Sequence, residues 1–332
     1  MIMIKDISLE ALSDIISETK KAIIIFHERP DGDAVGSAFA LKLLIEALGG
    51  RAYCLSGDEI PERLRFLTDG LQDSALKDSL PDGFDGATVI AVDCGSASQI
   101  GKLYEVFPPS ISIDHHGTTQ RFCDGYTDSS SAATAEIICD IGFDLLKKGR
   151  ITALPYRFAE CVYAAISSDT GCFRFSNATP DTHKRAARLL SLGIDASDIN
   201  HRLFSSKTRL MMIAEAESVK KLRTFANGKI AVVAFTADEI RELGIKRENF
   251  DAFIEVARSL DGAKVAISVR RSDGDTGCRV SMRSSSDVNV SDICAVFGGG
   301  GHVRAAGCTI DTEDVDEAVR LIVKETESRL KT

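Results

Sequence analysis

The sequence lacks long hydrophobic runs. The longest run near its start, residues 22–26, has five residues (AIIIF), far below the roughly 20 that a helix needs to span a bilayer. The first ten residues, MIMIKDISLE, lack the basic region, apolar stretch and small-residue cleavage site of a secretion signal. We therefore expect neither a membrane span nor a secretion signal.

Cysteine is present nine times, but no two cysteines form a Cys-x-x-Cys pair. An odd number of scattered cysteines is typical of small hydrophobic side chains in a reducing compartment rather than of a disulfide framework. We expect a cytoplasmic location. The sequence leaves the oligomeric state open, a homodimer included.

Basic side chains are in the minority, with 40 Lys and Arg against 49 Asp and Glu and a net charge of −9. A protein that covers long duplex nucleic acid needs many Lys and Arg to replace the counterions of the phosphates. The balance therefore argues against long duplex nucleic acid as a partner. It leaves room for a small anionic substrate that is held locally.

The apolar patterns predict an α/β protein, and 332 residues suit about two domains. Residues 1–194 alternate short β-branched runs with helical patterns, as in a doubly wound, mostly parallel sheet with both faces covered. Strands are expected at residues 22–26, 87–92 and 111–113. Helices are expected at residues 34–48, 131–148, 156–167 and 181–192.

Residues 195–227 predict a helical connector, because no Gly/Ser-rich or Pro-rich linker is present. Residues 228–332 predict a smaller α/β domain. Its expected elements are a strand at 230–235, a hairpin of 265–270 and 278–282, a helix at 290–297, a glycine loop (GGGGHVRAAG) at 298–307 and a closing helix at 315–330.

Four strand or helix ends in the first domain carry side chains that can bind metal. The stretch ISIDHHG, residues 111–117, opens as a buried strand and then presents Asp-His-His. The carboxyl ends of parallel strands lie along one edge of the sheet, where ligands bind. We therefore expect these residues to converge there: His27, Asp31, Asp33, Asp93, Asp114, His115, His116 and Asp169.

Five aspartates cannot lie close together unless their charge is compensated. Arg29 is the only basic residue inside these motifs, so divalent cations are the simplest solution. Carboxylate and imidazole without thiolate favour Mn²⁺ over a structural Zn²⁺ site, with Mg²⁺ and Co²⁺ as further candidates. The number of ligands suits two ions ~3.5–4 Å apart, a recurring arrangement for displacement at a phosphoester.

Each motif alone has an ordinary structural explanation. Asp-Gly-Asp is typical of a turn, and Asp33 suits the N-cap of helix 34–48. Asp93 and Asp169 could simply end a strand and a helix, and the two histidines could lie on the surface. Only their joint occurrence at four ends favours a metal site. The sequence contains neither a P-loop nor a dinucleotide fingerprint.

The motifs HERPDGDAVGS, VDCG, IDHH and SDTGCFRFSN, in this order, resemble the DHH phosphoesterase family, and GGGGHVRAAG resembles the glycine-rich motif of its associated C-terminal domain. Within the family, the chain is similar to the bifunctional oligoribonucleases and PAP phosphatases, the nanoRNases. The resemblance implies two Mn²⁺ ions that share Asp93 as a bridging ligand. One ion would be held by His27, Asp31 and Asp93, and the other by Asp33, Asp93, His115 and Asp169.

The resemblance also implies roles for the remaining residues. Asp93 and His116 would be catalytic, with His116 at the substrate phosphate or leaving group, and Asp114 would orient the adjacent histidines. Glycines in the second domain let the backbone approach a phosphate closely. The expected substrate-binding residues are His116, Arg174, Arg283, Gly299, Gly300, Gly301, His302 and Arg304.

The expected reaction is hydrolysis of short oligoribonucleotides to mononucleotides and of 3′-phosphoadenosine 5′-phosphate to AMP, in a cleft between the two domains. Alternatives within the family are a phosphodiesterase for cyclic di-AMP or pApA, a single-strand exonuclease and a pyrophosphatase. A non-catalytic nucleotide-binding sensor should lack at least one ligand, and a purely structural metal site would not need a phosphate-binding domain. Short single-stranded RNA or small phosphorylated nucleotides are therefore the expected partners.

Overall fold

The computed structural model describes residues 4–71, 82–117, 120–285 and 287–330. The chain forms two compact units, Met1–Ser206 and Lys207–Thr332. Each unit is built on its own β-sheet with helices packed against it, which confirms the predicted α/β fold class.

The sheet of the first unit has five parallel strands in the order β2-β1-β3-β4-β5. The sequence predicted the three central strands and missed the two edge strands. The edges carry residues that disfavour strands or break the apolar pattern, such as Asp124 and Gly125 in β5. The strands are β1 (Lys21–Phe26), β2 (Arg51–Ser56), β3 (Thr88–Val92), β4 (Ile111–Asp114) and β5 (Asp124–Thr127).

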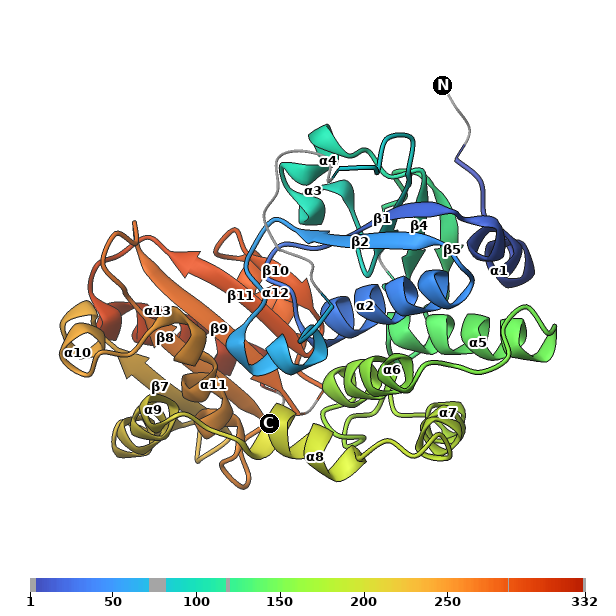
Figure 1. The fold of residues 1–332 in the computed structure, drawn as a ribbon. Helices are drawn as coiled ribbons and strands as arrows, with labels where there is room; N and C mark the ends of the chain where they lie inside the picture. The colour runs from blue at the N-terminus through green and yellow to red at the C-terminus, as the bar shows by residue number, and fades with distance from the viewer. Residues whose placement is uncertain (1–3, 72–81, 118–119, 286, 331–332) are drawn as a thin grey trace. The chain divides into compact units, whose positions relative to one another are not determined.

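Helices cover both faces of this sheet (Figure 1). Strand β1 supplies side chains to both cores: Ile24 and Phe26 to one, Ile23 and Ile25 to the other. This is why its five apolar residues run without alternation. One face packs against α1 (Leu9–Glu18), α2 (Gly32–Ala47), α5 (Thr134–Lys147) and α6 (Tyr156–Asp169), and the other against α3 (Ala97–Ile100) and α4 (Leu103–Val106).

The start of α2 differs from the prediction. Its N-cap is Asp31, whose Oδ1 accepts from the backbone N–H groups of Asp33 and Ala34, both at 3.0 Å. Asp33 lies inside the first turn, so its prediction as the N-cap is wrong. The helix begins two residues earlier because Asp31 provides the cap. Its first residue, Gly32, lies against α6, where a Cβ would lie 2.3 Å from the Ser168 hydroxyl oxygen.

Further helical segments lie between and after these elements. The first unit also contains η1 (Glu62–Leu67), α7 (Pro180–Leu190), α8 (Ala196–Asn200) and the π-helical η2 (His201–Ser205). Residues 195–227, predicted as a helical connector, contain α8, η2, α9 (Arg209–Lys220) and also the strand β6 (Arg223–Phe225). The connector's existence as a separate part stays a prediction. Among the residues that the structure describes, every helix is too short or too polar to cross a membrane.

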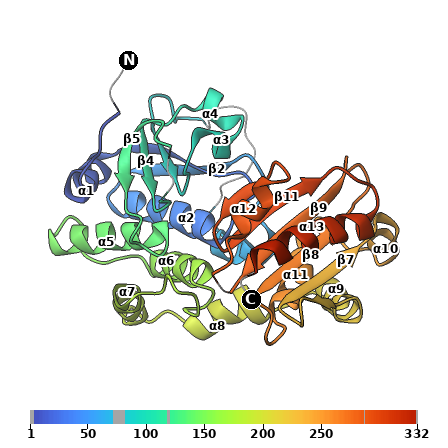
Figure 2. The ribbon, with the colours of Figure 1, turned by 180° about the vertical axis from the view of Figure 1, so that it is seen from behind.

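The second unit has a mixed six-stranded sheet in the order β10-β11-β9-β8-β7-β6. Only β7 and β8 pair in parallel. One face carries α12 (Val290–Ala295) and α13 (Val315–Arg329), and the other α9 and α11 (Asp251–Arg258) (Figure 2). The remaining elements are β6 (Arg223–Phe225), β7 (Ile230–Phe235), β8 (Val265–Arg270), β9 (Cys278–Ser284), β10 (Gly300–His302), β11 (Ala305–Ile310), α10 (Ala237–Glu242) and η3 (Arg247–Asn249).

The glycine segment forms a hairpin, so its prediction as a loop is wrong. Strand β10 pairs antiparallel with β11, Gly300 opposite Gly307 and His302 opposite Ala305, and Val303-Arg304 forms the turn. Gly299 is required at the approach, because a Cβ there would lie 2.3 Å from the Gly307 carbonyl oxygen. Sequence analysis missed these strands because glycine has low strand propensity and no side chain to pack.

Candidate active site

The structure brings the metal-competent residues of the first unit together at one edge of its sheet. His27 follows β1, Asp93 follows β3, and His115 and His116 follow β4. The helices α2 and α6 complete the cluster, because Asp31 and Asp33 lie at the start of α2 and Asp169 is the last residue of α6. The ligand atoms fall into three overlapping groups, and within each group they lie within 4.8 Å of one another.

The first group consists of His27, Asp31 and Asp93. The Nε2 atom of His27 lies 3.9 Å from Asp31 Oδ1 and 3.6 Å from Asp93 Oδ2. The Nδ1 atom of the same ring lies 2.8 Å from the Glu28 carbonyl oxygen. That contact assigns a proton to Nδ1 and directs Nε2 toward the two carboxylates, which is the orientation of a metal-binding histidine.

The second group repeats this design with Asp33, His115 and Asp169. The Nε2 atom of His115 lies 3.8 Å from Asp33 Oδ2 and 3.5 Å from Asp169 Oδ2. Its Nδ1 atom lies 3.3 Å from the Ser131 carbonyl oxygen. Both histidines are therefore oriented by a backbone carbonyl and present Nε2 to carboxylates.

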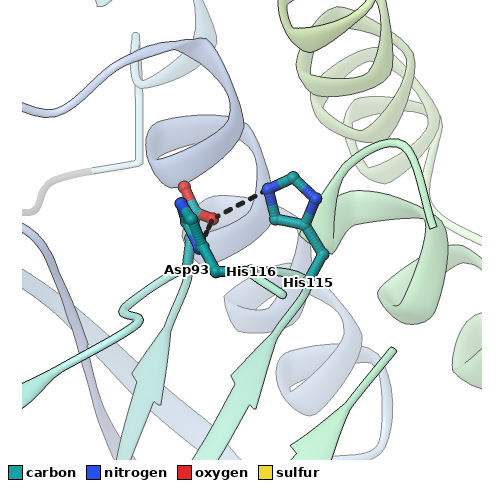
Figure 3. A group of neighbouring side chains, drawn as sticks. All are labelled: Asp93, His115 and His116. Atoms are coloured by element: carbon teal, nitrogen blue, oxygen red, sulfur yellow. Dashed lines mark ion pairs between the residues drawn. The ribbon is translucent and has the colours of Figure 1, made fainter. Parts of the chain in front are cut away.

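Asp93 belongs to the first group and also, with His115 and His116, to the third, so it connects the first group to the second. Its Oδ2 faces His27, whereas its Oδ1 lies 3.7 Å from His115 Nε2 and 3.7 Å from His116 Nδ1 (Figure 3). Asp93 adopts φ +58°, a left-handed conformation that costs a non-glycine residue about 1–3 kcal/mol. The bond from its N–H to the Ile113 carbonyl oxygen, at 2.9 Å, holds the backbone there. One carboxylate thus offers a different oxygen to each group.

Burial, and after it the charge of neighbouring carboxylates, raises the pKa values of three aspartates in the cluster. Burial, reinforced by the charge of Asp93, raises the pKa of Asp33 to about 7. Burial and neighbouring aspartates also raise the pKa values of Asp31 and Asp169. Burial opposes ionisation of Asp93 too, but the hydrogen bond from His27 and the charges of the three histidines bring its pKa below the ordinary value.

The same crowding raises the pKa of His27 to about 9: burial lowers it, but the hydrogen bond and charge of Asp93 and the charge of Asp31 outweigh that effect. The cluster therefore attracts positive charge. Its donor set of carboxylates and imidazoles fits divalent cations such as Mn²⁺. Cys94 is no thiolate ligand, because burial raises the pKa of its thiol and its Sγ donates to the Val92 carbonyl oxygen.

The start of α5 supports Asp33 and Asp93, and sequence analysis missed it. Asp33 accepts hydrogen bonds from the backbone N–H groups of Thr134 at 2.6 Å and Ala135 at 3.1 Å, and from the Ser37 hydroxyl at 2.8 Å. The Thr134 hydroxyl lies 3.0 Å from Asp93 Oδ1. A signal exists: the N-cap of α5 is Ala133, which provides no capping side chain, so its first amides need an acceptor from elsewhere.

His116 is held differently from the other two histidines. Its Nδ1 lies 2.7 Å from Asp114 Oδ1, and this hydrogen bond to a buried carboxylate raises the pKa of His116 to about 9. The ring therefore keeps a proton near neutral pH, and Nε2 points away from Asp114. The contact is consistent with the expected orienting role of Asp114 for His116, whereas His115 has its Nδ1 contact with Ser131.

Arg174 follows a left-handed stretch of backbone that begins two residues after Asp169. Gly171, Cys172 and Phe173 have φ values of 55°, 60° and 61°, an unusual run for two non-glycine residues. Arg174 is exposed, and its Nε donates to the Gly171 carbonyl oxygen at 2.6 Å. Asn177 donates to the carbonyl oxygens of Asp169 (3.1 Å) and Ala132 (3.2 Å), and so ties α6 to the segment before α5.

The candidate residues of the second unit share one end of its sheet. Ala305 pairs with Arg283 on one side and with His302 on the other. Residues directly opposite each other in antiparallel strands point to the same face, so Arg283 and His302 flank the small Ala305. The neighbouring glycines and one arginine are also accessible: Gly300, Gly301 and Arg304 are exposed, and Gly299 is partly exposed.

The comparisons with known proteins agree with the motifs. Residues 21–166 match the DHH family, N-terminal domain, and residues 227–328 match the DHHA1 domain. The bifunctional oligoribonuclease and PAP phosphatase NrnA of Thermus thermophilus is 33% identical over 318 residues, covering 93% of this chain and 92% of that protein. The protein of the same name from Bacillus subtilis is 26% identical over 299 residues, covering 89% and 90%.

A solved structure shares the fold. The exopolyphosphatase-related protein of Bacteroides fragilis superposes with a TM-score of 0.87 at 21% identity, covering 96% of this chain and 95% of that one. The family models lie in the order that the motifs predicted, and the Thermus relative extends over nearly the whole chain. The resemblance is confirmed: this chain belongs to the DHH family of phosphoesterases, and it is an enzyme.

Proposed function

We propose that this chain hydrolyses short oligoribonucleotides to mononucleotides and 3′-phosphoadenosine 5′-phosphate to AMP, with two divalent cations, Mn²⁺ first among them. The observation that carries the proposal is the position of Asp93, whose two oxygens face two separate groups of aspartate and histidine. The likeness to the oligoribonucleases and PAP phosphatases of Thermus and Bacillus supports this choice of substrates.

The two groups give each cation its own ligands. His27, Asp31 and Asp93 would hold one ion, and Asp33, Asp93, His115 and Asp169 the other. A bound pair of such cations acts as a Lewis acid on a phosphate and lowers the pKa of a water molecule to near neutrality. Binding would also compensate the burial and the mutual repulsion that raise the pKa values of Asp31, Asp33 and Asp169.

His116 supplies the proton that the leaving group needs. Asp114 holds Nδ1, so the ring donates from Nε2 to the departing 3′-oxygen as a general acid. The hydrogen bond to Asp114 keeps the ring protonated near neutral pH and fixes its orientation. Without a proton donor the 3′-alkoxide would leave as a strong base, so His116 acts on the step that breaks the ester bond.

The second unit would bind the substrate. Arg283 and Arg304 provide guanidinium groups for phosphate oxygens, and His302 lies beside Arg283 across Ala305. The backbone at Gly299, Gly300 and Gly301 lets a phosphate approach closely. Arg174 of the first unit is a further candidate for a phosphate contact. We place these substrates in the cytoplasm, where all nine cysteines would stay free, as they are in the structure.

Turnover of a substrate panel tests the proposal. Wild-type protein with Mn²⁺ is given RNA of two to five nucleotides, 3′-phosphoadenosine 5′-phosphate, cyclic di-AMP, pApA, long single-stranded DNA and pyrophosphate. We expect the highest kcat/KM on the short RNAs and on 3′-phosphoadenosine 5′-phosphate, and loss of activity after chelation. Highest rates on cyclic di-AMP, DNA or pyrophosphate, or on pApA well above other two-nucleotide RNAs, would assign the chain to another branch of the family.

A further inference from the structure

Thr134 contacts two of the carboxylates at once. Its backbone N–H donates to Asp33 Oδ2 at 2.6 Å, and its hydroxyl lies 3.0 Å from Asp93 Oδ1. We propose that Thr134 is a positioning residue that fixes the Asp93 carboxylate so that each oxygen serves a different cation. The inference rests on the two-cation function proposed above, and it assigns to Thr134 a role that its position at a helix start does not by itself require.

The Asp93 carboxylate needs such a restraint. The terminal torsion of an aspartate side chain is broad and roughly two-fold, so an unrestrained carboxylate can turn both oxygens toward one cation. A bridging role requires Oδ2 to face His27 while Oδ1 faces His115, as it does here. An ionised carboxylate only accepts hydrogen bonds, so the Thr134 hydroxyl is the donor. A donor on Oδ1 fixes the plane of the carboxylate.

Thr134 is itself held firmly. It is fully buried and is the first residue of α5. Its β-branched side chain has few rotamers, and its backbone is anchored through Asp33. The neighbouring amide of Ala135 donates to the other oxygen of Asp33 at 3.1 Å. Burial and the bonds to Asp33 and Asp93 therefore restrict the position of the hydroxyl, which is the property that a positioning residue needs.

The geometry predicts an unequal effect on the two cations. The hydroxyl acts on Oδ1, the oxygen that faces His115, and His115 belongs to the group with Asp33 and Asp169. The cation of that group should lose affinity when the hydroxyl is removed. The cation held by Asp93 Oδ2 with His27 and Asp31 should be affected much less. Loss of a residue that orients a metal ligand typically lowers metal affinity about 10- to 100-fold.

The test compares Thr134→Val with Thr134→Ser. Valine has nearly the same shape without the hydroxyl, and serine keeps the hydroxyl without the methyl group, while both keep the backbone bond to Asp33. Mn²⁺ binding is measured by electron paramagnetic resonance titration of the full chain without substrate. We expect two ions in the wild type. In Thr134→Val one ion should bind about tenfold or more weakly and the other within about threefold of wild type, and Thr134→Ser should bind both almost normally.

Several outcomes would overturn the role of Thr134. These are unchanged Mn²⁺ affinities in Thr134→Val, equal weakening of both ions, or a loss in Thr134→Ser as large as in Thr134→Val. Thermal unfolding with a chelator shows whether each variant folds. If Thr134→Val does not, Thr134→Ala against Thr134→Ser asks the same question. A wild-type chain that binds no Mn²⁺ overturns the proposed function as well, whereas normal wild-type binding with an unaffected variant overturns this inference alone.

Discussion

The acidic cluster of the first unit and the glycine hairpin of the second are built in opposite ways. In the cluster, side chains are held from distant elements: Asp33 accepts from an amide 101 residues later in the chain, and His115 is oriented by Ser131. In the hairpin, His302 and Arg304 are exposed and belong to one local turn of chain. Fixed atoms suit the step that breaks a bond, and an exposed hairpin suits the binding of a substrate.

The comparison predicts that changes in the cluster abolish turnover and changes in the hairpin weaken binding. The largest effect is expected for Asp93→Ala, because it removes the carboxylate that faces both groups. We expect kcat to fall by about 10³-fold or more, beyond the loss of a single oxyanion donor. Steady-state kinetics on a short RNA with Mn²⁺ measure the loss. Circular dichroism with a chelator serves as the folding control, and activity above a tenth of wild type would refute the bridging assignment.

His116→Ala should have the next largest effect. Loss of a general acid typically costs about 10²–10⁴ in rate, so we expect kcat on short RNA to fall by about 10²- to 10³-fold. A substrate with a p-nitrophenolate leaving group needs no proton, so its hydrolysis should fall much less. His302→Ala, the same change in the hairpin, is the matched control and should mainly raise KM. Equal losses on both substrates for His116→Ala would show that the residue acts as something other than an acid.

Arg283→Ala should change binding rather than chemistry. We expect KM for short RNA to rise about tenfold, equivalent to one charge-assisted contact, with kcat within about threefold of wild type. Arg279→Ala is the control, because Arg279 lies on the same strand but contacts the Thr309 hydroxyl. A fall in kcat with unchanged KM would place Arg283 among the residues of the chemical step and erase the contrast between the two regions.

Asp114→Asn should have the smallest effect of the four on kcat/KM near neutral pH. Its effect should appear in the dependence of kcat/KM on pH. The hydrogen bond to Asp114 is the largest of the interactions that raise the pKa of His116 from its ordinary 6.5 to about 9, so the variant should lose the proton at a lower pH than the wild type. The alkaline limb of kcat/KM on RNA should therefore move to lower pH. Bound cations lower the pKa of His116 in the wild type and in the variant alike. The prediction is therefore the difference in pH between the two alkaline limbs. Coincident limbs would show that Asp114 does not govern the proton of His116.

The sequence predicted the fold best where strands are buried on both faces. The strands expected at residues 22–26 and 87–92 form as β1 and β3, because continuous runs of β-branched and other apolar residues leave few alternatives. The edge strands β2 and β5 were missed, and so was the glycine hairpin, because pairing with a neighbouring strand determines those segments more than local propensity does. The sequence Asp-Gly-Asp offers two carboxylates as the N-cap of α2, and local sequence does not determine which one accepts from the first amides. For this reason Asp33 was predicted in place of Asp31.

The sequence by itself determined which side chains stand at the ends of the strands. The carboxyl ends of the strands in a parallel sheet lie along one edge. His27, Asp93 and His115 follow three of these strands and were therefore expected to lie close together. Only the tertiary structure decided how these atoms are aimed: which oxygen of Asp93 faces which histidine, and that Thr134 holds it. The physical reason is that a hydrogen bond between residues 41 positions apart depends on packing and leaves no local pattern in the sequence.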